Sequence, residues 1–239
     1  MGLVIGHPDA PLFSAEGVAG VYVGLERSLR ATGEFTYDVT EVVLFPDGQF
    51  RRNGLPRRGL DQDPSLDRDQ FGEMFWGRWE QSGDEVIATA SNTAYRFTVT
   101  PEGLQQEQGP IWERLPPMPL TSLDGVYARE DFRDPDAPRV QFGANGAFEE
   151  RGGFFAMVGS LGSFVEPDGE HASEMSAAES DLLISPGRGD YTLRNFSLTL
   201  RYTDGRVARH AFYVPPAPEN SAGPPFRLLV IGSYLLARD

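Results

Sequence analysis

The chain of 239 residues contains no cysteine and carries a formal net charge of −14 at pH 7, from 35 acidic and 21 basic residues. Every basic residue is arginine, because the sequence contains no lysine. This composition excludes thiolate nucleophiles, cysteine-ligated zinc, disulfides and Schiff-base lysines. The acidic balance also argues against nucleic acid as a partner, since affinity for a phosphate backbone depends on cationic side chains.

No stretch approaches the roughly 18 consecutive apolar residues that indicate a membrane helix. The first residues, Met1 to Pro8, have neither the basic region nor the long apolar segment of a signal peptide. As the sequence is written, we expect a soluble, cytoplasmic chain without a transmembrane segment. An exported form that has lost a signal peptide stays open, because a chain without cysteine is compatible with either compartment.

The sequence contains an internal duplication. Three short motifs occur twice, in the same order and at similar spacing, which indicates two copies of one structural unit. The prolines between the copies favour an extended connection. We predict an extended tail over residues 1–17, a first β-barrel repeat over 18–115, a proline-rich linker over 116–122 and a second β-barrel repeat over 123–239. The motifs are Gly20-Val21-Tyr22, Asp47-Gly48-Gln49-Phe50 and Trp112-Glu113-Arg114 in the first copy, and Gly125-Val126-Tyr127, Asn145-Gly146-Ala147-Phe148 and Tyr234 to Arg238 in the second.

Strands joined by tight turns dominate both copies. Asp-Gly and Asn-Gly pairs, which tolerate the positive φ angles of hairpin turns, lie between strand-like runs. They predict hairpins over 41–52, 139–150 and 196–214. The residues from Phe196 to Tyr202 alternate between apolar and polar, the period of a strand with one buried face.

No segment has a long helical period, and the short helix candidates lie over 64–75, 153–164 and 173–183. Each copy holds about seven or eight closely spaced strands, which suits a small closed barrel or a curled sandwich. We therefore predict an all-β protein of two related antiparallel calycin-like barrels or curled sandwiches in tandem, with little helix. Of the two architectures we favour barrels.

The Gly-x-Tyr motifs at 20–22 and 125–127 resemble the Gly-x-Trp signature of lipocalins and other calycins, with tyrosine in place of tryptophan. Arg114 and Arg238, near the last strand of each copy, are similar to the lipocalin arginine that packs across that aromatic ring. The resemblance covers both ends of each copy. It implies an up-and-down barrel that binds small apolar molecules, and the tandem arrangement resembles the two-barrel carotenoid hydratases.

His210 is the histidine that lies within a predicted strand. Alternation through 206–214 places it on the inward face together with Phe212, and a polar group among apolar neighbours inside a barrel is typical of a small-molecule site. Tyr95 and Phe97 take inward places in the first copy. A buried histidine more often serves a structural hydrogen bond, so catalysis by His210 is the hypothesis with the least support.

Aromatic side chains supply the other candidate site residues. Trp76 and Trp79 could line the entrance of a pocket for a flat apolar ligand, although such clusters more often form core. The apolar run over 154–164 is the candidate lid or interface. The predicted ligand-binding residues are Tyr95, Phe97, Trp76, Trp79, Tyr191, Tyr202, His210 and Phe212.

No motif indicates a metal or a cofactor. Asp61, Asp63, Asp67 and Asp69 lack the spacing and the distal glutamate of a calcium loop, so we interpret them as a solvated loop. No two histidines share a ligand spacing, and a Gly-x-Ser-x-Gly nucleophile elbow is absent. We therefore expect neither a metal nor a cofactor.

Three functions from different classes fit these patterns. The first, which we favour, is binding of a small hydrophobic molecule within a barrel. The second is a non-enzymatic structural or protein-interaction module whose barrels are filled by side chains. The third is an enzyme of the hydratase, isomerase or cyclase type in the second barrel, with His210 as acid or base. The expected partner is a small hydrophobic ligand or a protein, and the oligomeric state is open.

Overall fold

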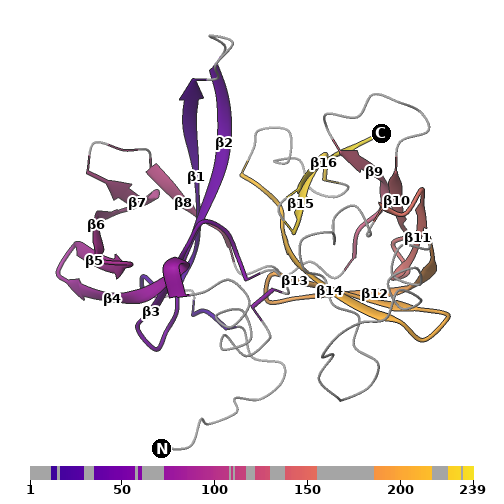
Figure 1. Cartoon of the computed structure of the whole chain (residues 1–239), viewed down its shortest axis with the longest axis horizontal. Coiled ribbons are helices and arrows are strands. Elements are labelled where there is room, and N and C mark those ends of the chain that lie inside the picture. Colours follow the sequence, from indigo (N-terminus) through magenta and orange to yellow (C-terminus); the bar gives the residue numbers. More distant parts are fainter. Residues whose placement is uncertain are drawn as a thin grey trace, which may run out of the picture. The chain divides into compact units, whose positions relative to one another are not determined.

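The structure is a computed structural model, and it describes residues 12–14, 17–29, 35–56, 59–60, 73–107, 109, 111–116, 122–129, 138–154, 186–216, 226–232 and 234–239. Within 25–29 and 35–39 the description covers the backbone. The described residues form two closed antiparallel barrels, each of eight strands (Figure 1). This confirms the predicted all-β fold and the preference for barrels over sandwiches.

The first barrel has simple up-and-down topology, in which each strand pairs with the next one along the chain. The barrel closes where β1 pairs with β8. Its strands are β1 (Gly20–Leu29), β2 (Phe35–Leu44), β3 (Gln49–Arg52), β4 (Trp76–Ser82), β5 (Glu85–Ala90), β6 (Thr93–Thr100), β7 (Gly103–Gln106) and β8 (Ile111–Arg114).

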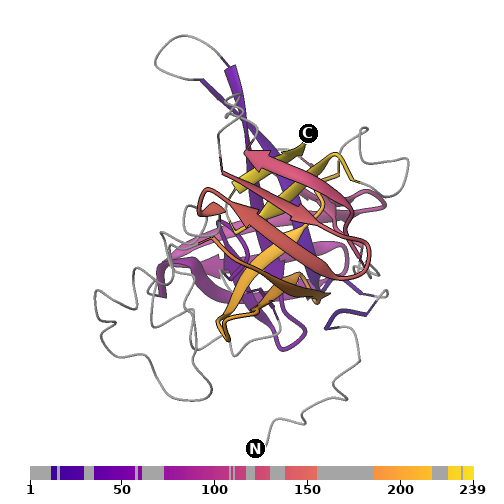
Figure 2. The ribbon, with the colours of Figure 1, turned by 90° about the vertical axis from the view of Figure 1, so that its right-hand side faces the viewer.

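The second barrel repeats this topology and closes where its last strand pairs with its first. In Figure 2 this barrel faces the viewer, and its yellow C-terminal strands lie beside the pink strands that come earlier in the chain. Its strands are β9 (Gly125–Arg129), β10 (Arg139–Phe142), β11 (Ala147–Arg151), β12 (Arg188–Arg194), β13 (Ser197–Tyr202), β14 (Val207–Tyr213), β15 (Leu228–Ile231) and β16 (Tyr234–Arg238).

The three predicted hairpins are confirmed. The pair β2–β3 spans the first, β10–β11 the second and β13–β14 the third. In the turn of the first hairpin, Gly48 has a φ of 81°, and in the second Gly146 has a φ of 86°, both in the left-handed region that favours glycine. The Asp-Gly and Asn-Gly pairs therefore set these hairpins in the way the sequence predicts.

Helical structure within the described part of the chain is limited to the 3₁₀ turn η1 (Glu73–Phe75) and to Phe154. No helix in this part is long and apolar enough to cross a membrane. Most residues of the three helix candidates lie outside the described ranges, and so does nearly all of the candidate lid over 154–164. The predicted solvated loop with Asp61, Asp63, Asp67 and Asp69 lies outside them as well.

Each barrel contains an inward glycine at the same place in its fold. Gly77 in β4 lies opposite Phe50, and Gly189 in β12 lies opposite Phe148. A Cβ atom at Gly77 would lie 1.7 Å from a carbonyl oxygen of the neighbouring strand, and one at Gly189 would lie 1.9 Å from the corresponding oxygen. Both positions therefore require glycine, because the backbones approach too closely for any side chain. This shared feature gives the residue correspondence between the two copies.

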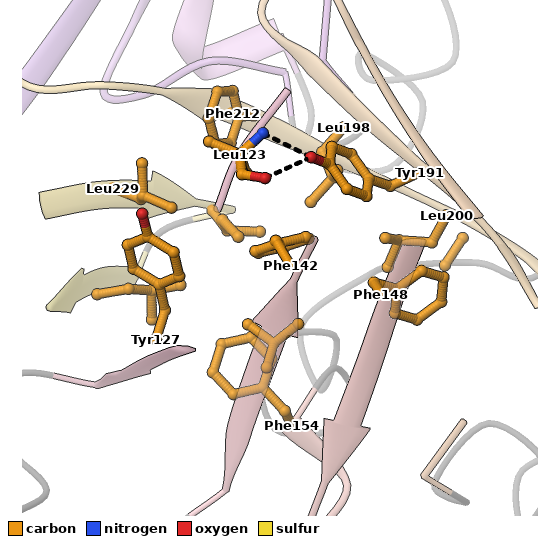
Figure 3. Packing of buried hydrophobic residues seen from close by; sticks show 14 of the residues in the cluster. Leu123, Tyr127, Phe142, Phe148, Phe154, Tyr191, Leu198, Leu200, Phe212 and Leu229 are labelled. Carbon is orange, nitrogen blue, oxygen red and sulfur yellow. Dashed lines mark hydrogen bonds between the residues drawn. The ribbon is translucent and has the colours of Figure 1, made fainter. Parts of the chain in front are cut away.

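Aromatic and branched side chains fill the interior of the second barrel (Figure 3). Phe142 and Tyr191 meet edge to face with ring centroids 5.0 Å apart, and Phe148 and Tyr202 meet in the same way at 5.0 Å. This geometry places the positive edge of one ring against the negative face of the other. The packing supplies the hydrophobic core that stabilises this unit.

The chain divides into two compact units, one of residues 1–53 and 71–117 and the other of 54–70 and 118–239. Residues 54–70 follow β3 of the first barrel in sequence but group with the second. Within that second unit, the backbone N–H of Leu60 donates a buried hydrogen bond to Ser197 Oγ at 3.0 Å. Gly59 has a φ of 89°, and a Cβ atom there would lie 1.9 Å from the same oxygen. The repeat motifs alone do not predict this grouping.

Candidate functional site

The inward face of the first barrel forms one apolar cluster with a small number of polar side chains. Strand alternation and pairing identify the inward residues, since Phe50, Val42, Ala88 and Phe97 all belong to the buried core. Trp79 lies opposite Ala88 and is therefore inward, as is Tyr95 on the other side of Ala88. The other buried members of the cluster are Val18, Tyr22, Leu44, Val86, Ala90, Leu104 and Trp112.

Arg52 is a charged residue of this interior that the sequence analysis missed. It lies opposite Val42 of the core, two residues after the inward Phe50, so its side chain belongs to the inward face. Its Nη1 donates a hydrogen bond to the hydroxyl of Tyr95, and its guanidinium carbon lies 5.4 Å from the centre of the Tyr95 ring. A guanidinium over an aromatic face is held by attraction to the ring quadrupole.

The Nε atom of Arg52 is buried and has no hydrogen-bond acceptor in the described part of the protein. Burial of an unsatisfied donor of a charged group costs free energy, of order 1–3 kcal/mol or more. Among the same residues no carboxylate pairs with this guanidinium, whereas the exposed Arg96 lies 2.7 Å from Glu85 and Arg206 lies 2.8 Å from Asp204. Arg52 is thus a half-buried cation on the inward face to which no described carboxylate is paired.

Trp112 supplies a second buried donor in the same cluster. Its ring lies against Gly24, where a Cβ atom would be only 2.9 Å away, and it meets Phe97 edge to face at 6.4 Å. Its Nε1 is buried, and no described residue accepts a hydrogen bond from it. The inward Trp79 differs, because its Nε1 donates to the carbonyl oxygen of Phe45 at 2.9 Å. Two donors in one interior therefore lack acceptors.

The inward aromatic side chains of this barrel are not sealed from water. Trp79, Tyr95 and Val99 are partly exposed although they pack on the core. Trp76, which the sequence analysis placed with Trp79, lies on the opposite, outward face of β4. There it stacks on Phe45 at 5.4 Å, below the guanidinium of Arg51 at 5.8 Å. Of the eight predicted residues, the first barrel thus brings together Trp79, Tyr95 and Phe97.

Four of the eight predicted ligand-binding residues belong to the second barrel, and all four lie on its inward face: Tyr191, Tyr202, His210 and Phe212. The Tyr191 hydroxyl accepts a hydrogen bond from the backbone N–H of Leu123 at 2.5 Å and lies 3.0 Å from the carbonyl oxygen of Leu123 (Figure 3). Its burial raises the pKa of this hydroxyl. Tyr191 therefore anchors the chain entering the barrel rather than offering a free polar group to a ligand.

Two other tyrosines of this second interior also make internal contacts. The Tyr127 hydroxyl donates to the carbonyl oxygen of Phe226 at 2.8 Å, and burial raises its pKa to about 12. Burial raises the pKa of Tyr202 as well, together with the charge of buried Glu150 and a hydrogen bond between the two side chains. The guanidinium of Arg206 opposes that shift from 4.2 Å above the ring. These tyrosines remain neutral at physiological pH.

His210 lies opposite Leu198 in the interior of the second barrel and is almost completely buried. The inward orientation expected from alternation is confirmed. Burial lowers its pKa to about 4, because an apolar interior disfavours the imidazolium form. At neutral pH the ring is therefore uncharged. Such a group can accept or donate a hydrogen bond but does not act as an acid near pH 7.

The two interiors differ most where β5 and β13 correspond. Ala90 and Tyr202 occupy equivalent places, since each lies opposite the inward glycine of its barrel. The next inward position along each strand is Ala88 in the first barrel and Leu200 in the second. The first barrel thus carries small side chains at two places where the second carries large ones. This leaves less of the first interior filled from this strand, whereas the facing strand shows the opposite difference, because Tyr95 lies opposite Ala88 and Ala208 lies opposite Leu200.

A hollow of about 370 Å³ lies on the outer face of the second barrel. Three arginines and two acidic residues line it, and two of the arginines are paired, Arg139 at 3.0 Å from Asp239 and Arg151 at 3.9 Å from Glu149. No predicted site residue lines it. Since opposite charges already face each other, this hollow offers less to a charged ligand than the interior of the first barrel. Its remaining lining residues are Gly125, Val126, Gln141 and Arg238.

No group of three or more potential metal ligands comes together among the residues described. The chain matches no protein-family model, no curated protein and no solved structure. The geometry of the two barrels therefore carries the functional argument alone.

Proposed function

We propose that the protein binds a small, mainly apolar molecule inside its first barrel, and that the second barrel is a structural unit. The observation that supports this proposal is the presence of two buried donors, Arg52 Nε and Trp112 Nε1, without acceptors among the described residues, on an otherwise apolar inward face. Apolar walls with a few convergent polar groups are typical of small-molecule sites.

The contrast between the two interiors supports the assignment of the site to the first barrel. Small side chains at Ala88 and Ala90 and the water-accessible rings of Trp79 and Tyr95 favour entry of a ligand. In the second barrel, the hydroxyls of Tyr127 and Tyr191 already bond to the backbone. A filled interior of this kind stabilises a fold but leaves little for a ligand to contact.

The proposal can be tested with a neutral apolar probe, 1-decanol, followed by tryptophan fluorescence. The chain has 3 tryptophans, and all of them belong to the first barrel, with Trp79 and Trp112 on its inward face. We expect a saturable change in emission upon titration. Native mass spectrometry of protein from its own host, followed by denaturing extraction, would then identify the molecule that it carries.

A matched pair of variants separates the two barrels. Ala88→Leu introduces the residue that the second copy has at the equivalent position, so it should fill the first interior and abolish binding of decanol. Leu200→Ala makes the reverse change in the second barrel and should leave the binding constant unchanged. Equal loss of binding in both variants, or no saturable binding by the unmodified protein, would refute the proposal.

A further inference from the structure

We propose that the molecule bound in the first barrel carries a carboxylate, and that Arg52 selects it by pairing with this head group. The inference rests on the proposed function, since it concerns the same interior. It assigns to Arg52 the role of a specificity-determining residue and defines the ligand class as an apolar body with one negative charge.

The first argument is that no described carboxylate pairs with the guanidinium of Arg52. A guanidinium inside a protein is normally paired, because desolvation without an anion is costly. No carboxylate of the described residues pairs with it, and its one hydrogen-bond partner there is the hydroxyl of Tyr95. The protein carries a net charge of −14, so the lack of a carboxylate at this place is not a consequence of composition. A negative charge brought by the ligand would complete the pair.

The second argument is the kind of hydrogen bonds that the site offers. The hydroxyl of Tyr95 accepts a hydrogen bond from Arg52, which leaves its own proton available for donation. Arg52 Nε and Trp112 Nε1 also offer protons without acceptors. The site thus presents donors, and an ionised carboxylate is a group that only accepts. A single guanidinium matches a single negative charge with its planar fork of donors.

The third argument comes from the second copy. Glu150 occupies the position that Arg52 has in the first, two residues after the phenylalanine that faces the inward glycine. There the side chain is buried and bonded to Tyr202 within the barrel. The two copies therefore carry opposite charges at one inward position. This reversal is expected if Arg52 serves a ligand and Glu150 serves the fold.

The experiment compares three ligands with the same ten-carbon chain: decanoate, 1-decanol and decylamine. Binding to the full chain is measured by tryptophan fluorescence and calorimetry at constant ionic strength near neutral pH. One charge-assisted hydrogen-bonded pair in a partly buried site corresponds to about a tenfold to hundredfold gain in affinity. We expect decanoate to bind more tightly than decanol by about this factor, and decylamine to bind most weakly.

Variants assign that preference to Arg52. Arg52→Gln should abolish the advantage of decanoate while decanol still binds, and Arg52→Glu, which copies the charge of the second barrel, should favour decylamine. Arg96→Gln is the matched control, because it removes the same charge from the outer face of β6, one residue from Tyr95. Tyr95→Phe keeps the ring and should reduce the advantage partially, so it tests the site even if the Arg52 variants do not fold.

The outcomes are distinguishable. Equal affinity for decanoate and decanol would overturn the carboxylate assignment and leave the proposed function standing. A preference for decanoate that persists in Arg52→Gln and Tyr95→Phe would overturn the role of Arg52. Absence of binding by all three ligands would remove the proposed function, and the inference with it.

Discussion

Arg114 lies directly opposite Tyr22 where β8 closes the first barrel against β1. Its Nη2 donates hydrogen bonds to the carbonyl oxygens of Ser14 and Ala19, at 2.8 and 2.6 Å. The second barrel has the same arrangement, because Arg238 lies opposite Tyr127. These residues carry the resemblance to lipocalins, and the register shows that they are neighbours across the closing strands. Membership of that family stays a prediction.

The glycine beside each of these arginines gives a first prediction. A Cβ atom at Gly125 would lie 2.7 Å from Arg238 Nε, and the residue has a φ of 139°. Gly20 has a similar clash, 2.8 Å from Arg114 Nε, but no positive φ. We expect Gly125→Ala to lower the free energy of unfolding by about 1–3 kcal/mol through backbone strain, and Gly20→Ala to lower it less. Urea unfolding of both variants checks this order, and the reverse order would contradict it.

The inward glycines give a second prediction. Gly77→Ala and Gly189→Ala each place a Cβ atom against a carbonyl oxygen of the neighbouring strand, so each should disrupt its own barrel by more than about 3 kcal/mol. Hydrogen exchange read by peptide should show lost protection in β4 and β5 for the first variant, and in β12 and β13 for the second. Gly83→Ala is the comparison: nothing lies within 4 Å of its Cβ position, so it carries only the strain of its φ of 63° and should cost about 1–2 kcal/mol.

His210 gives a prediction on pH. Its pKa is about 4 in the folded protein and near 6.5 in the unfolded chain, so between these values only the unfolded chain binds the proton. Acidification from pH 7 to 4 should therefore destabilise the protein through this residue by about 3 kcal/mol, and below pH 4 the effect should not grow further. His210→Leu should remove this component. The free energy of unfolding in urea is measured across this pH range for the unmodified protein and for His210→Leu. If both change with pH by the same amount, the interpretation is wrong.

Ser197 gives a fourth prediction. Ser197→Ala removes the acceptor for the buried N–H of Leu60, and an unsatisfied buried donor costs about 1–3 kcal/mol. We expect faster amide exchange at Leu60, measured by NMR or by mass spectrometry of peptides over 54–60. Exchange in β1 and β2 serves as the internal control and should stay unchanged. Unaltered amide exchange at Leu60 would mean that its hydrogen bond to Ser197 does not stabilise the position of this segment.

Local sequence features predicted much of the fold. The Asp47-Gly48 and Asn145-Gly146 turns specify hairpins through the positive φ of glycine, and strand alternation placed His210 inward. Two turns escaped this reasoning, one at Ser91 and Asn92 and the other at Asn195 and Phe196. Ser91 and Asn92 have φ angles of 47° and 64°, so tertiary pairing holds a left-handed turn in a sequence without glycine.

The site was predictable only in part. Alternation identified Tyr95 and Phe97 as inward, but the position of Trp76 depends on the register of β4, which its imperfect pattern does not define. Arg52 had a signal, because it lies two residues after the inward Phe50 and shares its face. The sequence alone does not show which groups surround Arg52. That no described carboxylate pairs with Arg52 is visible only once the strands are placed in the barrel.

The hydrogen bond from Leu60 to Ser197 spans 137 residues. During synthesis the amide of Leu60 leaves the ribosome long before its acceptor exists, and closure of so long a loop is slow and entropically costly. The first copy can close its own strands early, whereas the segment after Arg52 waits for the second. A gene divided at the proline linker would therefore yield an N-terminal half in which the buried Leu60 amide lacks its acceptor and residues 54–70 lack the unit with which they group. Such a half should be prone to aggregate, so the duplicated gene is expected to persist as one reading frame.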